Sequence, residues 1–428
     1  MSNLAAHLVP GDWQSPATEP GWLTDALRNA WHQLEAKKLP TVRQEDWKYT
    51  SLELLAKRQF ATRTQLPAAD WVADQLSGLR GGLRLVFVDG FFAENHSVTR
   101  AAGNGLTIGP LNANLDAAGL ETHIGAADID AEPGFSLLAT ARFNDGVYID
   151  LQDSCAIDIP VEIVHISTGD SVYHQRNVVR LGTCARLEVS EHYISTEGST
   201  GLVNNHTAVE LSANADLDWV RVQQHESAGF VVTRTQVSQR AASKFNYFGM
   251  DTGGRLVRHD IHSRLLESGA EVRLAGVTVI AGQQHVDNHT NIEHIAADCI
   301  SRERFKAVAA GRSRVVFNGK IKVHPGADGT DSSQSNANLL LSAHAEVDTK
   351  PEMEIYADDV IAAHGATVGQ LDETAVFYLR SRGLSELEAR QLLIRGFCRE
   401  LVDNVSDEQL REFIDDKLAR ALPGAGSA

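Results

Sequence analysis

The stretch Leu181-Gly-Thr-Cys-Ala185-Arg-Leu187-Glu-Val189 decides the fold, because its pattern returns along the second half of the chain. A short turn leads into a small residue, and two apolar residues then alternate with polar ones. Such alternation is typical of a strand that buries one face. The copies begin about thirty residues apart, with one larger gap before Ser313, at Ala185, Ala215, Ser243, Ala270, Ser313 and Ala345.

A strand-and-turn unit of this length, without helices between its copies, predicts a solenoid of β rungs. Each rung would pair with the next through its backbone, with the small residue at a corner and the apolar residues facing inward. An antiparallel sandwich is the alternative, since strand spacing alone does not separate the two architectures. The protein is therefore expected to be mainly β.

Both flanks of the strand-rich region differ from it in pattern. Near the N-terminus, Leu27, Ala30, Trp31 and Leu34 follow helical spacing, and residues 83–90 indicate a buried strand. In the tail, Ser385-Glu-Leu-Glu388 has the pattern of a capping box, and Ser406-Asp-Glu-Gln409 repeats it. We expect an N-terminal mixed α/β cap over residues 1–144, a β-helix core over 145–368 and a C-terminal helical domain over 369–428.

Charge and cysteine content limit the function. A formal charge of −17 and a pI near 5.4 argue against nucleic acid or an anionic membrane as the main partner. The first seven residues lack a basic start and an apolar run, and no apolar stretch is long enough to span a bilayer. Four scattered cysteines form no CxxC pair, so reduced thiols in the cytoplasm are expected.

Several side chains in the second half are candidate ligands. His285, Asp287 and His289 would share one face of a strand, and two imidazoles with a carboxylate suit Fe(II) or Zn(II). His294 with Cys299 is a second weak candidate for handling iron or sulfur. Polar strands often carry such spacing without binding metal. The chain has no GxSxG, HExxH or Walker A motif, so it lacks ATPase machinery of its own.

His364 lies in a glycine-bracketed turn, His364-Gly-Ala-Thr-Val-Gly369, that follows an acidic segment. The adjacent glycine leaves the imidazole uncrowded, which suits a metal ligand or a pH-sensitive contact. A structural role for an isolated histidine is the alternative. The aromatic and basic run Phe377-Tyr-Leu-Arg-Ser-Arg-Gly383 follows it closely.

Four segments, in order along nearly the whole chain, carry a resemblance to a known family. They are the stretch from Glu346 to Gly383, Arg43-Gln-Glu-Asp-Trp-Lys-Tyr-Thr50, Leu85-Val-Phe-Val-Asp-Gly90 and Val315-Val-Phe-Asn-Gly319. Together they resemble the SufB/SufD family of bacterial iron–sulfur cluster assembly scaffolds, on its SufD side. The resemblance implies a right-handed parallel β-helix, which favours the solenoid over the sandwich.

The resemblance also implies a function. A SufD-like scaffold subunit would catalyse nothing itself, would pair with SufB, and would bind the ATPase SufC through its C-terminal helices. ATP-driven rearrangement of SufC would open a cluster-assembly site at the SufB–SufD interface, with His364 as a cluster or iron ligand. The cluster or iron would be transient and no cofactor would stay bound, while association of a flavin with the complex stays open.

This chain departs from the family pattern at two places. Ala362 occupies the position where SufD members can carry a cysteine, and no cysteine lies between Cys299 and Cys398, where SufB carries an essential one near residues 336–338. Thiolate at a shared junction would therefore come from SufB, with His364 supplying nitrogen. The absence favours SufD over SufB.

Two other functions stay open on sequence grounds. One is a self-associating β-solenoid with a structural role, since SufD-like chains can pair with themselves as homodimers. The other is a β-helix polysaccharide-active enzyme. Enzymes of that kind are typically exported and place acidic or basic groups along a groove. The dispersed carboxylates and the absence of a recognisable signal peptide argue against the enzyme.

Overall fold

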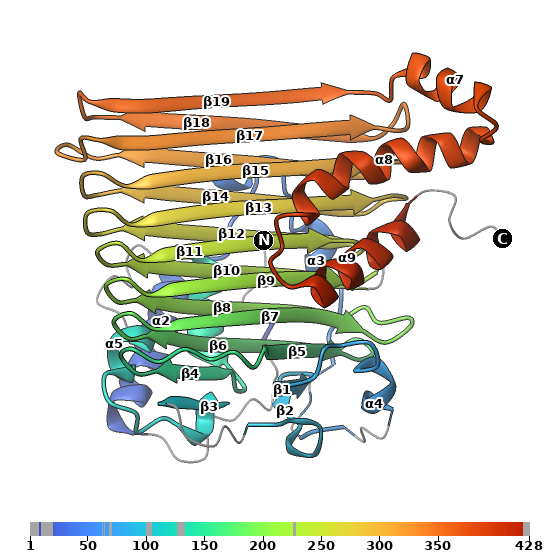
Figure 1. The fold of residues 1–428 in the computed structure, drawn as a ribbon. Helices are drawn as coiled ribbons and strands as arrows, with labels where there is room; N and C mark the ends of the chain where they lie inside the picture. The colour runs from blue at the N-terminus through green and yellow to red at the C-terminus, as the bar shows by residue number, and fades with distance from the viewer. Residues whose placement is uncertain are drawn as a thin grey trace.

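The computed structural model describes residues 8–9, 20–61, 63, 65–67, 71–99, 105–125, 133–225 and 228–422, so the first seven residues lie outside it. Two long sheets face each other, and successive strands alternate between them (Figure 1). From β4 onward each strand pairs in parallel with strands two places away in the numbering, as β7 does with β5 and β9. This is a parallel β-solenoid, so the predicted coil is confirmed and the sandwich alternative is wrong.

We name each sheet after its last strand. The β19 sheet has ten strands: β1 (Leu83–Val88), β2 (Phe91–Phe92), β5 (Val161–Ser167), β7 (Arg186–Ser195), β9 (Asp216–Gln224), β11 (Lys244–Asp251), β13 (Glu271–Ile280), β15 (Ile300–Ala309), β17 (Thr330–Leu340) and β19 (Val360–Gly369). The β18 sheet has nine: β3 (Leu106–Pro110), β4 (Val147–Leu151), β6 (Val172–Leu181), β8 (Leu202–Leu211), β10 (Phe230–Gln239), β12 (Leu256–Leu265), β14 (His285–His294), β16 (Arg314–Val323) and β18 (Glu346–Ile355).

The gap in the sequence repeat has a structural origin. The first four copies lead into strands of the β19 sheet, whereas the copies at Ser313 and Ala345 lead into β16 and β18 of the other sheet. Between them lies a copy that the sequence pattern does not reveal. It begins at Cys299, which precedes β15, and places Ser301 and Glu303 in register with Val272 and Leu274 of β13.

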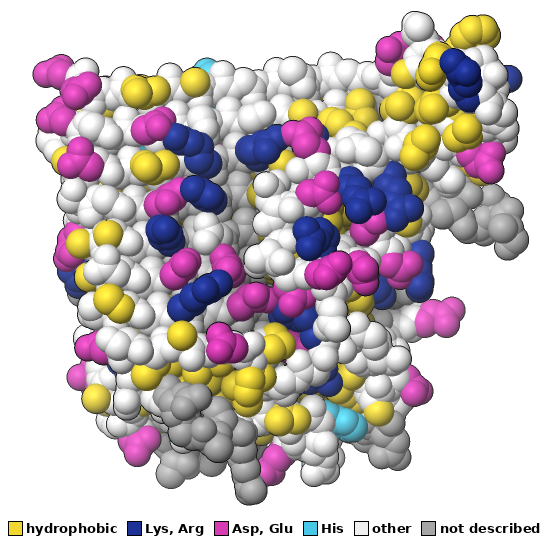
Figure 2. Space-filling model, viewed as in Figure 1, with side chains coloured by type: hydrophobic (Ala, Val, Ile, Leu, Met, Phe, Trp, Pro, Cys, Tyr) yellow, Lys and Arg dark blue, Asp and Glu magenta, His cyan; other side chains and the backbone are white. Residues whose placement is uncertain are grey.

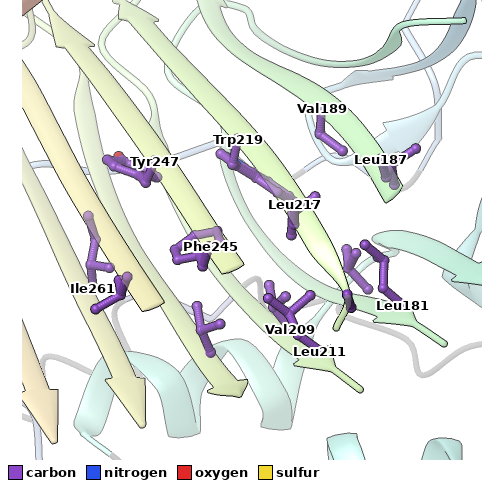
Figure 3. Close-up of a cluster of buried hydrophobic side chains, with 14 of the residues drawn as sticks. Leu181, Leu187, Val189, Val209, Leu211, Leu217, Trp219, Phe245, Tyr247 and Ile261 are labelled. Atoms are coloured by element: carbon purple, nitrogen blue, oxygen red, sulfur yellow. The ribbon is translucent and has the colours of Figure 1, made fainter. Parts of the chain in front are cut away.

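Apolar side chains from both sheets fill the lower and middle coils. Figure 3 shows Leu217, Trp219 and Tyr247 of the β19 sheet and Ile261 of the β18 sheet directed into the space between the sheets. All four are at most 4% exposed. Full burial of such a side chain contributes roughly 1.5–3 kcal/mol, so the stacked rungs supply much of the stability.

Helices of the N-terminal region cover the outward face of the β18 sheet. The helices α2 (Gly21–Lys37) and α6 (Gly134–Arg142) pack there against Val172, Leu202 and Phe230. With β1 to β3 this gives the expected mixed α/β cap, and the division at residue 145 stays a prediction. Its shorter elements are η1 (Glu45–Trp47), α3 (Glu53–Ala56), α4 (Val72–Gln75), η2 (Glu94–His96), η3 (Leu111–Ala113) and α5 (Leu120–Ile124).

The C-terminal helices are α7 (Glu373–Ser381), α8 (Glu386–Val402) and α9 (Glu408–Ala421), of which α8 and α9 return over the outward face of the β19 sheet (Figure 1). Ser385 forms the predicted capping box: it accepts from Glu388 N at 3.3 Å, and its own N–H donates to Glu388 Oε2 at 2.8 Å. The second cap differs from the prediction, because Asp407 rather than Ser406 accepts from Leu410 N at 2.6 Å. Throughout the described residues, every helix is too short or too polar to cross a bilayer.

We expect Leu217→Ala to lower the free energy of unfolding by about 2–5 kcal/mol, because Leu217 is fully buried and its truncation leaves a cavity. Chemical denaturation followed by circular dichroism measures the shift. Leu387→Ala is the matched control, since Leu387 is 48% exposed and should change stability by less than about 0.5 kcal/mol. Equal shifts for the two variants would contradict the assignment of the core.

Candidate functional site at the open end of the solenoid

His364 lies on β19, the last strand of its sheet, and its side chain is exposed. Its position is in register with Gln334 of β17, which in turn aligns with Glu303 of β15. This column continues down the inward face through Leu274, Tyr247 and Trp219. The imidazole therefore stands on the inward-facing column where the coil is open.

Directly below His364 the column is polar and buried. Gln334 Nε2 donates to Glu303 Oε2 at 2.6 Å, and both side chains are at most 3% exposed. Burial raises the pKa of Glu303 to about 7, and its contacts with Thr290 and Gln334 only partly oppose this. Near neutral pH, Glu303 thus holds a proton in a substantial part of the molecules.

The amide of Gln334 reaches across the interior to the β18 sheet. There it lies so close to Gly319 of β16 that a Cβ atom at this position would collide with it. Gly319 ends the Val315–Gly319 motif. The close approach of the Gln334 amide explains why this position of the motif is a glycine. Gly276 plays the same part for Phe305, whose ring atoms would come within 2.7 Å of an added Cβ.

Other inward-facing side chains of β17 are also polar. Asn338 Nδ2 donates to Asn336 Oδ1 at 2.6 Å and to the carbonyl of Thr367 at 3.0 Å. Ser332 Oγ lies 2.8 Å from Ser301 Oγ. Along the column of His364 the interior thus changes from apolar at Leu274 to hydrogen-bonded at Glu303 and Gln334. The larger gap in the repeat was the one signal of this change, because it falls where Ser301 and Glu303 replace apolar residues.

His285, Asp287 and His289 share one face of β14, as their spacing predicts, and that face points outward under the N-terminal cap. Asp287 Oδ1 lies 2.9 Å from His289 Nε2, and Asp287 Oδ2 lies 2.7 Å from Arg258 Nη1. Although burial opposes it, His289 and Arg258 hold the pKa of Asp287 well below its usual range. Among the described residues no group of three or more His, Cys, Asp or Glu side chains is arranged to hold a metal ion. Metal binding here stays a prediction.

The segment around Trp47 covers these residues. Thr50 Oγ1 lies 2.9 Å from His285 Nε2 and also donates to Asp287 Oδ2. The Trp47 ring stacks on the Arg258 guanidinium at 3.9 Å, and Lys350 of β18 forms a 2.9 Å ion pair with Glu45. The motif around Trp47 therefore fastens the N-terminal cap to the β18 sheet, a role that its sequence did not reveal.

His294 and Cys299 are both buried. His294 Nε2 lies 2.9 Å from Ser301 Oγ, and burial lowers the pKa of His294 to about 4. Cys299 Sγ donates to the carbonyl of Glu267 at 3.4 Å, and burial raises the pKa of its thiol. A protonated, enclosed thiol is a poor nucleophile and a poor ligand. That His294 and Cys299 handle iron or sulfur stays a prediction.

A second exposed feature follows directly after β19. Phe377 and Tyr378 of α7 are 70% and 56% exposed, and Leu392 of α8 is 51% exposed. Figure 2 shows hydrophobic side chains gathered over α7 at the corner of the molecule. Exposed apolar groups gathered in this way are a common feature of interaction surfaces.

Comparison with known proteins gives a consistent result. The family described as "SUF system FeS cluster assembly, SufBD core domain" matches residues 164–397. The chain is 31% identical to the iron–sulfur cluster assembly protein SufD of Escherichia coli, over 92% of this chain and 91% of that protein. It is 29% identical to an iron–sulfur cluster assembly SufBD family protein of Synechocystis, over 91% and 88% of the two chains. A chloroplastic protein of Arabidopsis thaliana, ABCI7, is 28% identical over 63% of this chain and 58% of its own.

We expect Glu303→Gln to flatten the pH dependence of stability. Between about pH 4.5 and pH 7 the folded chain keeps a proton on Glu303 that the unfolded chain loses, so stability falls as pH rises through this window. Urea denaturation measures the free energy of unfolding of both proteins. The value for Glu303→Gln minus that for the wild type should increase by about 2 kcal/mol from pH 5 to pH 7.5. Parallel pH profiles for the two proteins would contradict a buried, protonated Glu303.

Proposed function

Because the chain belongs to the SufB/SufD family of SUF-system iron–sulfur cluster assembly proteins, we propose that it is a SufD-like, non-catalytic scaffold subunit of the cytoplasm. It pairs with SufB through the open end of the solenoid and binds the ATPase SufC through its C-terminal helices. The cluster, or iron on its way into one, is cargo held at the shared junction. The chain keeps no permanent cofactor, and association of a flavin with the complex stays open. The observation that carries the proposal is the exposed His364 on the free edge strand.

The open end supports the pairing. One edge of β18 and one edge of β19 have no neighbouring strand among the described residues, and such edges invite pairing with another chain. Ile361 is 70% exposed, Tyr356 58% and Val368 47% on or beside these strands. A sister solenoid would satisfy the backbone groups and cover the apolar side chains. A second copy of this chain fits the same description, so self-association is the alternative occupant.

At that junction His364 contributes one nitrogen ligand. Iron in clusters favours thiolate, and imidazole is an accepted substitute. Since no cysteine lies between Cys299 and Cys398, the thiolate comes from the SufB side. The site is then complete only when both subunits are present, which fits a scaffold that assembles a cluster and passes it on.

SufC docks on α7 and α8 in this proposal. Three residues separate the end of β19 at Gly369 from the start of α7 at Glu373, so a displacement of α7 acts directly on the strand that carries His364. In contrast, α8 is held on the β19 sheet by Ile394 and Leu401, and Glu400 pairs with Arg304 and Lys306 of β15. ATP-driven movement of SufC would thus open the junction while the solenoid stays rigid.

We predict that His364→Ala leaves folding and assembly with SufB and SufC intact but lowers cluster formation severalfold. An exposed side chain contributes little to stability, whereas a missing ligand weakens cluster binding. The readouts are the visible absorbance spectrum and the iron and sulfide content of the anaerobic three-subunit complex.

His344→Ala is the matched control, because His344 is also exposed but lies in the turn before β18, outside the inward-facing column. It should give the cluster yield of the unmodified complex. A full yield from His364→Ala would remove His364 as a ligand. Equal losses in both variants would point to a general effect of removing exposed histidines.

Phe377→Ala is expected to weaken binding of purified SufC about tenfold, because it removes the most exposed aromatic side chain of α7. Isothermal titration calorimetry measures the dissociation constant. Ile159→Ala serves as the control, since Ile159 is 54% exposed and lies before β5, far from α7 in the sequence. Unchanged affinity in the Phe377 variant would exclude this surface of α7 from the SufC interface.

A further inference from the structure

Gln334 has one polar atom that the protein leaves unused. Its side chain is 3% exposed, and its Nε2 donates to Glu303 Oε2 at 2.6 Å. Its Oε1 is buried and has no hydrogen-bond partner among the described residues. A buried carbonyl oxygen without a partner is destabilising, so such an atom in a polar site calls for an explanation.

The contacts of Gln334 fix which way its amide points. Glu303 lies on β15, the rung below, and takes the amide N–H group. Gly319 on the opposite sheet lets the amide lie across the interior rather than fold back on its own strand. Because the two ends of a planar amide diverge, the oxygen is turned away from Glu303. The rung above is β19, which pairs with β17.

His364 occupies the matching position on that rung. It is in parallel register with Gln334, and neighbouring strands lie about 4.8 Å apart. At this spacing an imidazole N–H can reach the amide oxygen of the residue directly below. The other ring nitrogen then faces outward, because the two ring nitrogens lie on opposite edges of the imidazole.

In the structure no hydrogen bond joins His364 to Gln334. We propose that Gln334 is a positioning residue: when the His364 ring turns toward it, its Oε1 accepts a hydrogen bond from one ring N–H and fixes the tautomer whose free nitrogen faces the junction. When ionised, Glu303 can only accept, so it holds the amide in the orientation that presents oxygen rather than N–H to the rung above. Metal-binding histidines are commonly oriented by such a partner on their other nitrogen. This inference rests on the proposed role of His364 as a ligand.

Nuclear magnetic resonance of the full-length chain, labelled with 15N at histidine, tests the contact directly. His364→Ala identifies the ring signals of His364, and exposed His344 supplies an internal reference for a free imidazole. In the unmodified chain, the ratio of the two neutral tautomers should be about ten times larger for His364 than for His344. That factor corresponds to about 1.4 kcal/mol, the worth of one hydrogen bond. In Gln334→Met, which keeps the length but lacks the acceptor, the ratio should return to that of His344.

Above pH 7, where Glu303 is mostly ionised, Glu303→Gln provides a second and milder variant. A glutamine at 303 can donate as well as accept, so it no longer dictates which end of the Gln334 amide points upward. It should shift the His364 tautomer ratio toward the mixture. Ser332→Ala is the control, because Ser332 lies on the same face of β17 but bonds to Ser301 in a neighbouring column. It should leave the ratio unchanged. The proposal would be overturned if the His364 tautomer ratio were the same in the unmodified chain, in Gln334→Met and in Glu303→Gln.

Failure of this inference can be told apart from failure of the proposed function. If His364→Ala lowers cluster yield in the three-subunit complex but the His364 tautomer ratio does not change when Gln334 is replaced, only the positioning role is wrong. If the ratio depends on Gln334 while His364→Ala gives a full cluster yield, the contact stands and the ligand role of His364 falls. Both roles are supported when the ratio and the yield change together.

Discussion

The whole structure depends on one constraint: every rung must hydrogen-bond in parallel to the rung below and the rung above. Parallel register aligns equivalent residues in columns, so each inward-facing side chain must fit the ones directly under and over it. Large and small residues are matched accordingly, as Phe305 is with Gly276. The same constraint leaves β18 and β19 with an edge that no strand of the described residues covers. The stability of the coil and the unpaired strand edges at its end therefore have one cause.

The outward faces of the two sheets are covered by different parts of the chain, and this divides their roles. The N-terminal cap is fastened to the β18 sheet by polar and aromatic contacts, among them Trp47 on Arg258 and Thr50 on Asp287. The C-terminal helices are held on the β19 sheet mainly by apolar packing through Ile394, Leu401 and Ile414. The helix that follows β19 projects beyond both covers (Figure 1). The two sheets are thus covered on their outward faces, and one helix is left exposed.

The polar interior near the open end is a costly arrangement for a solenoid. An apolar residue in place of Glu303 would extend the core formed by Trp219, Tyr247 and Leu274 in the same column. Instead a carboxyl group is buried and its pKa is raised, which burial alone disfavours. Polar groups retained at such a cost are commonly tied to function. Here they lie between the core and the one exposed histidine of the column.

The sequence by itself determined the repeating strands, the mixed cap and the capped tail helix, because alternation and capping are local patterns that neighbouring residues carry. It also showed that His285, Asp287 and His289 share a face, but not which face. Only the tertiary structure placed them beneath Thr50 and brought Glu303 and Gln334 under His364. Glu303, Gln334 and His364 lie about thirty positions apart, and their alignment depends on the length of each coil. Register between distant strands is a property of the closed solenoid, which no local pattern contains.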